Sequence, residues 1–410
     1  MFNILVILLW VHPVLNSEHY GEQEELYRVG KITISRNQVF NTRDSTTSNW
    51  IEGVANQVHV LTKERTIRSR LLFKEGDVYD QNLVQETGRV LRAMGIIGDI
   101  EIRCDTVANN TVDITIVTAD KWTLGLSTSY KRDGEITSYS AMIKDDNFLG
   151  NAQSISVGYN YSSDRRRPHG AEIILNEPYL FEDWWRMTIQ YKTNEYLDIK
   201  TVLLERDFFS DTTPWSLGVY ADAGRNRVRI FTDGVLSKEY DLHQENQLVR
   251  GALSFGTWPK LRLGFAYIRT RTSVDAAMFR SYDNVDLLNL SLGVMNRTYY
   301  TTSYIENFGR VEDVPLGYQA SVTTGNNFHH FEVASPNYFL RANWQHALRP
   351  YTDWYIGYDA VLSTFLADDK FSDAVFRFGC IQHFRLSERN VLVLRSSLVL
   401  GLNWSHGEQL

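Results

Sequence analysis

Residues 122–130 read Trp-Thr-Leu-Gly-Leu-Ser-Thr-Ser-Tyr, so apolar or aromatic side chains alternate there with small or polar ones. A period of two is that of a β-strand with one apolar face and one polar face. The same alternation returns along the rest of the chain, at residues 154–161, 185–191, 215–221, 261–267, 288–294, 354–362, 376–380 and 392–404. The second part of the chain is therefore predicted to be all-β and antiparallel.

Two all-β architectures give this alternation. Strands of about ten residues with one apolar, aromatic face are typical of a transmembrane barrel, whereas a soluble β-sandwich gives the same period. The chain has 22 Tyr, 20 Phe and 10 Trp but only 8 Pro, which fits the aromatic girdles of a membrane barrel. Because small polar residues fill the other face, we expect a wet or plugged lumen and predict the barrel, with the sandwich as the alternative.

The N-terminus differs from the rest of the chain. Residues 2–15 are apolar except for Asn3 and His12, and the chain turns polar at Asn16. About a dozen apolar residues are too few to span a bilayer but suit a secretory signal. We therefore predict a signal peptide over residues 1–17, with a buried N-terminal helix as the alternative.

Composition excludes several classes of protein. The net charge of −7 gives no reason to expect nucleic acid as a partner. The negative mean hydropathy excludes a bundle of transmembrane helices. Cys104 and Cys380 are the only cysteines and cannot form a disulfide framework or a zinc site, so we expect both to be small apolar residues.

A small α+β unit is predicted over residues 28–120. Residues 29–35 alternate like a strand, residues 49–59 and 66–73 have helical spacing, and residues 81–94 form an amphipathic helix that ends at Gly95. Two strands follow, at residues 100–104 and 112–117. The order is β-α-α-β-β, and about 90 residues suffice for one core.

The run from Ile67 through Glu75-Gly-Asp77, with Leu91-Arg-x-x-Gly95 and the strand Asp99-Ile-Glu-Ile102, resembles a POTRA domain. POTRA domains are the periplasmic modules of the BamA/TamA superfamily of outer-membrane barrels. Two departures from the family pattern are an insertion of roughly twenty residues at 41–61 and the presence of one such module where BamA-type proteins carry several.

Two segments of the second unit are similar to the first turns of a BamA-type barrel. They are Asp145-Asp-Asn-Phe-Leu-Gly150 and Leu175-Asn-Glu-Pro-Tyr-Leu-Phe181, although Glu177 interrupts the family's Asn-Pro-Tyr turn. The motif residues that the resemblance implies are Asp146, Asn147, Phe148, Leu149, Gly150, Asn176, Pro178 and Tyr179. Residues 122–410 are then expected to belong to an outer-membrane barrel (the surface antigen family) that has 16 strands in the complete protein.

The end of the sequence departs from that family. The 289 residues from Trp122 to Leu410 are few for sixteen strands with their loops, which need roughly 300 to 400 residues. The family's Arg-Gly-Phe/Tyr motif is also not found, since Val249-Arg-Gly251 is followed by Ala252 and is interpreted as a coincidence. We expect this sequence to be incomplete at its C-terminus, without that motif and the last strands.

No catalytic constellation is recognised, so the chain is predicted to be neither an enzyme nor cofactor-dependent. His329-His330 could suggest a metal with Glu332, but adjacent strand residues point to opposite faces. Asp368-Asp369 and Glu312-Asp313 are interpreted as solvated loop carboxylates rather than calcium ligands. No metal site is predicted.

The resemblance implies a function in inserting or translocating proteins at the bacterial outer membrane, with the POTRA domain in the periplasm. In that family the strand after the second helix lies at the sheet edge, where unfolded outer-membrane or secreted clients can add a strand by β-augmentation. Here that strand comprises Ile100, Glu101, Ile102, Arg103 and Cys104. Membrane lipids and accessory periplasmic proteins are the other expected partners.

Two other functions stay open. One is a two-partner secretion pore for a dedicated passenger, against which the single POTRA module and the BamA-like hairpins argue. The other is a surface-antigen barrel without any transport role. Fold alone does not choose between them.

Overall fold

The computed structural model describes residues 26–39, 52–53, 56–57, 59–107, 110–163, 168–181, 183–194, 196–274, 284–303, 305, 311–327, 338–367 and 370–402. The predicted signal peptide, most of the helical segment at 49–59 and the pair His329-His330 lie outside these residues. Asp368 and Asp369 also lie outside them. None of the described helices is long and apolar enough to cross a membrane.

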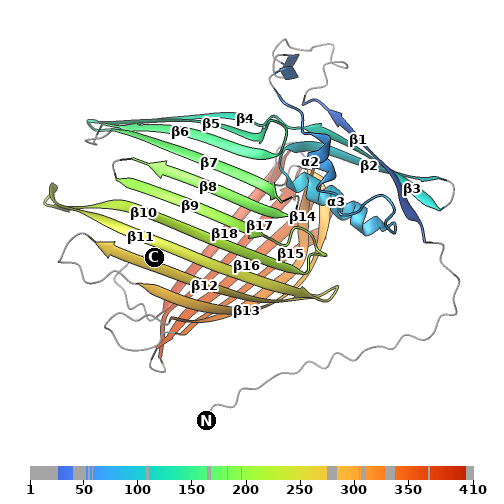
Figure 1. The fold of residues 1–410 in the computed structure, drawn as a ribbon. Coiled ribbons are helices and arrows are strands. Elements are labelled where there is room, and N and C mark those ends of the chain that lie inside the picture. Colours follow the sequence, from blue (N-terminus) through green and yellow to red (C-terminus); the bar gives the residue numbers. More distant parts are fainter. Residues whose placement is uncertain are drawn as a thin grey trace.

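The N-terminal domain is a three-stranded sheet with two helices (Figure 1). Its elements are β1 (Arg28–Asn37), α2 (Glu64–Arg68), α3 (Gln81–Ala93), β2 (Ile97–Val107) and β3 (Thr111–Asp120). The order of the described elements is the predicted β-α-α-β-β. In space the strand order is β1-β3-β2, with β1 parallel and β2 antiparallel to β3.

Alternation explains the core of this domain. Every second residue of β3 is buried, with Ile114 and Ile116 fully so, and they meet Ile67 of α2 and Leu91 of α3. Asp80 caps α3 by accepting a hydrogen bond from the Asn82 N–H at 2.8 Å. The domain therefore has a core of its own.

The rest of the described chain forms one antiparallel sheet of fifteen strands in sequence order, each paired with the next. The strands are β4 (Leu124–Asp133), β5 (Ile136–Phe148), β6 (Gln153–Ser162), β7 (His169–Leu180), β8 (Trp185–Thr193), β9 (Leu197–Arg206), β10 (Trp215–Thr232), β11 (Val235–Phe255), β12 (Lys260–Val274), β13 (Val285–Ser303), β14 (Val311–Asn327), β15 (Tyr338–Tyr351), β16 (Trp354–Ala367), β17 (Lys370–Arg385) and β18 (Val391–Leu402).

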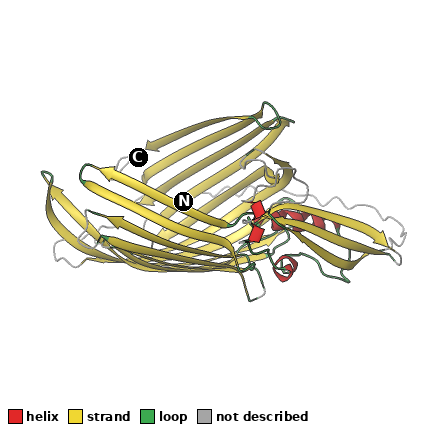
Figure 2. Cartoon of the chain, turned by 90° about the horizontal axis from the view of Figure 1, so that it is seen from above, coloured by secondary structure: helices red, strands yellow, loops and turns green. Residues whose placement is uncertain are grey.

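This sheet curls so that its last strands lie behind its first ones (Figures 1 and 2). No described strand joins β18 to β4, so both are edge strands. The predicted closed, 16-stranded barrel therefore stays a prediction. We call the sheet end beside the N-terminal domain proximal and the opposite end distal.

The two faces of the sheet differ in chemistry. One face, here called the apolar face, exposes large hydrophobic side chains on strand after strand, among them Leu126 (72% exposed) and Leu290 (57%). No second sheet covers it among the described residues. A soluble sandwich buries such a face, so the sandwich alternative is wrong for the described part of the chain.

The second turn prediction is wrong in detail. Asn176, Pro178 and Tyr179 belong to the last residues of β7, and the chain reverses after Leu180. The β7–β8 ladder shifts register between Glu177 and Leu180, and such a bulge tolerates a proline because no ladder hydrogen bond is required there. Asp145 and Phe148 flank a similar shift at the end of β5.

Candidate functional site

A groove of about 1060 Å³ separates the N-terminal domain from the proximal end of the large sheet. On the domain side it is lined by β2 and α3, including Ile100, Ile102 and Leu83. On the opposite side lie residues of the proximal sheet end, including Trp258 and Tyr299. The groove therefore extends from β2 of the domain sheet to the proximal end of the large sheet.

Strand β2 lies at the edge of the domain sheet, as the resemblance implied. The N–H of Ile100 donates to the Asp99 carboxylate at 2.9 Å, so it is not turned toward β3. Residues two apart in an antiparallel strand direct their N–H groups to the same side. The N–H groups of Ile102 and Cys104 therefore face the free edge.

The predicted client-binding residues divide between the two faces of β2. Ile100 and Ile102 are half-buried and pack against the domain core; the Ile102 Cδ1 lies 3.5 Å from where a Cβ on Gly88 of α3 would be. Glu101 and Arg103 form an exposed ion pair at 2.7 and 2.8 Å. This hydrogen bond lowers the pKa of Glu101 and raises that of Arg103.

Cys104 differs from its prediction. It is a free thiol, as is Cys380, but it is exposed and lines the groove rather than packing as a small apolar residue. The reason is its place near the end of the edge strand, where residues 103–107 are all exposed.

One face of α3 contacts the proximal turns through charged groups. Arg92 donates to both carboxylate oxygens of Asp313, at the start of β14, at 2.7 and 2.9 Å. Glu86 bonds Arg89 and accepts a hydrogen bond from the Asp211 N–H at 3.0 Å. Asp313 is thus an ion-pair partner and neither a calcium ligand nor a solvated carboxylate.

The electrostatics of this contact follow from burial and proximity. Burial lowers the pKa of Arg89, but the hydrogen bond and charge of Glu86 outweigh it and hold that pKa above its ordinary value. Burial, and next the charge of Glu86, raise the pKa of the Asp211 carboxyl. The contact is therefore ionic and partly desolvated.

The first motif turn holds the N-terminal domain. The fully buried Asn147 amide donates to Thr62 Oγ1 at 2.9 Å and accepts from the Ala152 N–H at 2.9 Å. The Gly150 carbonyl accepts hydrogen bonds from the Lys63 N–H at 2.8 Å. The predicted turn thus binds the residues that begin α2.

The second motif segment makes a different contact. The Pro178 carbonyl accepts a hydrogen bond from Arg70 at 2.9 Å, and the guanidinium carbon lies 4.2 Å from the centre of the Tyr179 ring. The structure therefore brings the two turn motifs together at the domain contact. It does not bring them to β2, which lies on the groove.

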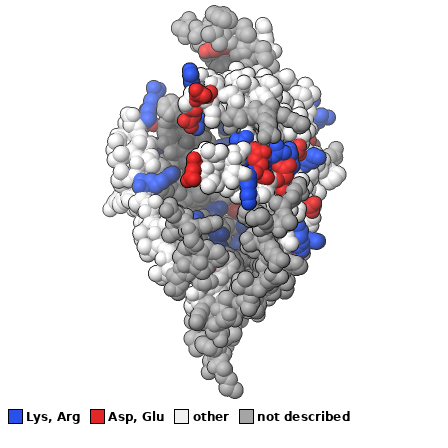
Figure 3. All heavy atoms as spheres, turned by 90° about the vertical axis from the view of Figure 1, so that its left-hand side faces the viewer, with Lys and Arg blue, Asp and Glu red and all other residues white. Residues whose placement is uncertain are grey.

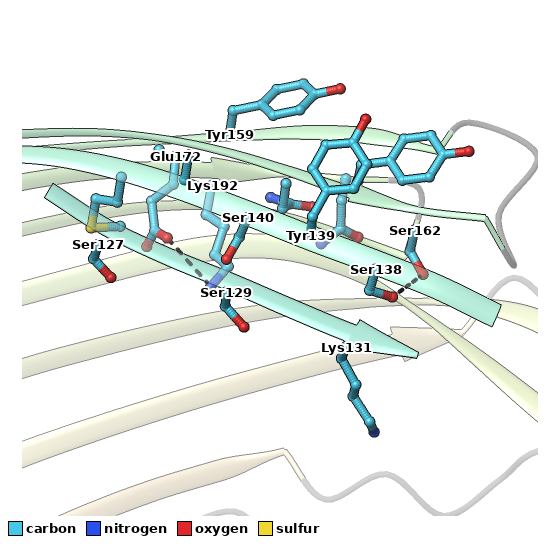
Figure 4. A pocket seen from close by; sticks show the side chains of 16 residues that line it. Ser127, Ser129, Lys131, Ser138, Tyr139, Ser140, Tyr159, Ser162, Glu172 and Lys192 are labelled. Atoms are coloured by element: carbon cyan, nitrogen blue, oxygen red, sulfur yellow. Dashed lines mark hydrogen bonds and ion pairs between the residues drawn. The ribbon is translucent and has the colours of Figure 1, made fainter. Parts of the chain in front are cut away.

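The second face of the sheet, here called the polar face, is lined by hydroxyl groups near β4. Figure 4 shows Ser127, Ser129 and Lys131 of β4 on one side of the sheet, while Tyr139 and Tyr159 project from the other. A hollow of about 400 Å³ lies over this patch, which also contains the ion pair of Glu172 with Lys192 at 3.6 Å. Because these side chains are small and carry hydroxyl groups, this part of the polar face offers few apolar contacts.

Charged side chains pair on both faces of the large sheet: Glu205 lies on the polar face, whereas Arg225 and Arg227 share the face of Val219. The side chain of Glu205, 3% exposed, bonds both Arg186 and Arg250. Val249-Arg-Gly251 lies inside β11 rather than at the start of a strand, which agrees with its interpretation as a coincidence. At the distal end Arg225 and Arg227 bond Asp241, and Figure 3 shows basic and acidic side chains side by side on that end.

The described residues contain no group of three or more His, Cys, Asp or Glu that could hold a metal ion. His169 is bonded to the Tyr159 hydroxyl at 2.5 Å. What the groove and the free β2 edge can do is bind an extended chain through main-chain hydrogen bonds.

Sequence patterns point to no role for Arg70, Arg89 or Arg92. One signal was present: Glu86, Arg89 and Arg92 are spaced by three residues and so share a face of the helix. A charged helix face is ordinarily solvated, so the pattern by itself does not indicate a contact. Arg70 belongs to the segment 66–73 with predicted helical spacing, but α2 ends at Arg68 and Arg70 lies in the turn after it; helical spacing by itself indicates no contact.

Comparison with solved structures finds BamA and CdiB proteins. They include BamA from Haemophilus ducreyi lacking POTRA domains 1–3 (13% identity, TM-score 0.32, 90% of this chain and 72% of that one). CdiB from Acinetobacter baumannii gives 10% identity and a TM-score of 0.35 over 92% and 74% of the two chains. CdiB from Escherichia coli gives 11% and 0.41 over 93% and 67%.

BamA is the protein after which the resembled superfamily is named. No family model and no curated protein sequence matches the chain. TM-scores below 0.5 carry no functional conclusion.

Proposed function

We propose that this chain is a BamA/TamA-type outer-membrane barrel that assists protein insertion or translocation, with a POTRA domain over residues 28–120 in the periplasm. The observation that carries the proposal is the unpaired edge of β2, which opens on a groove that ends at the proximal turns of the large sheet. A client strand added to β2 would lie next to the proximal end of the barrel. Neither a nucleotide nor a metal is required for this.

The apolar face supports a membrane location. Exposed leucines, valines and aromatic residues recur along it on strands from β4 to β18. A soluble protein rarely exposes an apolar patch beyond a few hundred Å². In lipid the same face is stabilised, and the polar face lines a hydrated lumen.

The directions of the first and last strands of the large sheet support the predicted strand number. Because the described sheet has fifteen consecutive antiparallel strands, β4 and β18 run in the same direction. One further strand running from the distal to the proximal end would be antiparallel to both, which is what a closed barrel of sixteen strands requires.

A two-partner secretion pore is the second candidate, and the hydroxyl-lined polar face favours it. Small serine side chains along β4, β5 and β6 would let an unfolded passenger slide with few contacts. This candidate requires capture at the groove as well, but delivery through the lumen.

The test uses the full chain in lipid vesicles and an unfolded eight-stranded outer-membrane barrel as the client. A photocrosslinker replaces Asn82, which lines the groove. Cys104→Pro removes an outward N–H without disturbing the packing of Ile102, and Cys104→Ser keeps the N–H as a matched control. Proline is tolerated where the N–H faces away from the ladder.

We expect crosslinking to fall roughly tenfold in the proline variant, because a hydrogen bond is lost and the ring blocks close approach. The serine variant should crosslink like the wild type. Equal crosslinking in the two variants would refute capture at β2. Capture without insertion of the client would favour the secretion pore, and no capture by the wild type would leave a barrel without transport.

A further inference from the structure

Alternating rings and guanidinium groups join the N-terminal domain to the large sheet. Arg70 follows α2, and its guanidinium carbon lies 4.2 Å from the Tyr179 ring centre and 5.1 Å from that of Trp184. Trp184 stacks on Phe209 with centres 4.1 Å apart and planes at 5°. The stack therefore spans the β7–β8 and β9–β10 turns.

The stack continues into the sheet itself. The Arg206 guanidinium carbon lies 4.9 Å from the Phe209 ring centre and 4.0 Å from that of Trp215, the first residue of β10. Arg206 also donates to the Trp215 carbonyl at 3.0 Å. Arg70 is thus the residue that the N-terminal domain contributes to this series of stacked groups. The series ends on Arg206 of β9 and Trp215 of β10.

Burial makes Arg70 a specific contact. Arg70 is 5% exposed, and its Nε has no hydrogen-bond partner among the described residues. Burial lowers its pKa to about 10. A charge kept out of water is tolerated when aromatic faces and a carbonyl replace the hydration, and these come from Tyr179, Trp184 and Pro178 of the barrel.

The remaining described contacts of the domain lie at the β5–β6 turn and on α3. The β5–β6 turn binds the start of α2 through Gly150 and Asn147. On α3, Arg92 pairs with Asp313 and Glu86 accepts a hydrogen bond from the Asp211 N–H. The charged side chains of α3 in these contacts are partly exposed, so water can replace a partner that moves away. Arg70 is buried more deeply and contacts the adjacent hairpin.

We propose that Arg70 is the positioning residue that orients the N-terminal domain so that the β2 groove faces the barrel mouth. This inference deepens the proposed function, and its consequence for clients rests on that function. The orientation of the domain can be measured without any client. A flat guanidinium is required, because it can lie over the Tyr179 ring and also donate in its own plane to the Pro178 carbonyl, whereas a lysine ammonium is a compact point charge.

The test measures a distance in the full chain in lipid vesicles. Spin labels are placed on Cys104 of β2 and on Glu388→Cys in the proximal β17–β18 turn, with Cys380→Ser removing the other thiol. Wild-type Arg70 should give one narrow distance. Arg70→Lys and Arg70→Gln should lose that single peak and give a broad distribution.

Controls separate orientation from folding. Arg68→Gln changes the last residue of α2, two positions before Arg70, whose contacts to Glu64 and the Ile32 carbonyl stay within the domain, and should keep the narrow peak. Trp184→Phe keeps a ring and should retain the peak, whereas Trp184→Leu should lose it. Resistance of the domain to limited proteolysis should be unchanged in the Arg70 variants.

A narrow wild-type distance in both Arg70 variants would overturn the proposal, as would an equal loss in Arg68→Gln. Client crosslinking at Asn82 is measured in a separate experiment from the spin-label distance. Capture that persists in Arg70→Lys while client insertion falls supports positioning. Absence of capture in the wild type would defeat the proposed function and leave the measured orientation standing.

Discussion

Single residues decide how closely the domain approaches the sheet. Gly150 has a φ of +74°, and a Cβ there would collide with the Leu61 carbonyl oxygen. The turn therefore requires glycine twice, for its backbone conformation and for the close approach of another chain segment. The sequence motif indicated a turn at this glycine, but not the neighbour that excludes a side chain.

Gly150→Ala should lower the free energy of unfolding by about 2–5 kcal/mol, because backbone strain and overpacking add. Gly134→Ala is the matched control: its φ is +61° and nothing lies within 4 Å of the added Cβ, so it should cost about 1 kcal/mol. Urea titrations of both variants in detergent micelles measure the difference. Equal losses would show that Leu61 moves aside freely.

Packing between elements sets the place of β2. Gly88 of α3 faces Ile102, and the contacts of an added Cβ, to Ile102 Cδ1 and Arg92 Nη1, are both ordinary at 3.5 Å. The helix therefore does not need glycine for space at this point. Charges or proline at Ile102 would disturb this packing, which makes Cys104 the better position for testing the strand edge.

Gly88→Ala should raise the free energy of unfolding by about 0.5–1 kcal/mol, since alanine restricts the unfolded chain and favours a helix. Gly30→Ala in β1 should instead destabilise, because its Cβ would displace the Asp113 carboxylate from the hydrogen bond that it accepts from the Lys31 N–H. Thermal unfolding followed by circular dichroism measures both. A loss of stability in Gly88→Ala would mean that α3 and β2 are packed more tightly than these contacts indicate.

The whole molecule places an apolar face outside and a polar face opposite it. On β13 the neighbours Leu290 and Ser291 belong to different faces, and Leu290 is 57% exposed. Their alternation is a local property, whereas the continuous face arises because all fifteen strands keep it in register. The proposed membrane insertion therefore depends on the complete sheet and not on any single strand.

Leu290→Lys should destabilise the inserted protein by about 2–4 kcal/mol, because a charge in mid-strand would face lipid. Ser291→Lys places the same group on the polar face and should cost much less. Urea-dependent folding into lipid vesicles, followed by the heat-dependent gel mobility of the folded form, compares them. Similar costs at both positions would contradict the assignment of the two faces.

Strand type and the order of the first domain followed from the sequence, but several strands did not. The patterns at 185–191 and 261–267 correspond to β8 and β12. Strand β9 showed no clear alternation because Lys200 lies in the apolar row, opposite Tyr191 and Ala223. A long charged side chain can reach water from a lipid-facing position, so local hydrophobicity there understates the strand.

The sequence by itself determined the period-two strands and the β-α-α-β-β order, and its resemblance to a POTRA domain implied that the strand at 100–104 lies at the edge of the sheet. These depend on neighbours along the chain, where side-chain direction follows from backbone geometry. Only the tertiary structure showed that Asn147, Gly150 and Tyr179 hold the domain, and that Arg70 and Arg92 meet the proximal turns. Those contacts join residues between 85 and 221 positions apart, and no local pattern specifies which distant surfaces will meet.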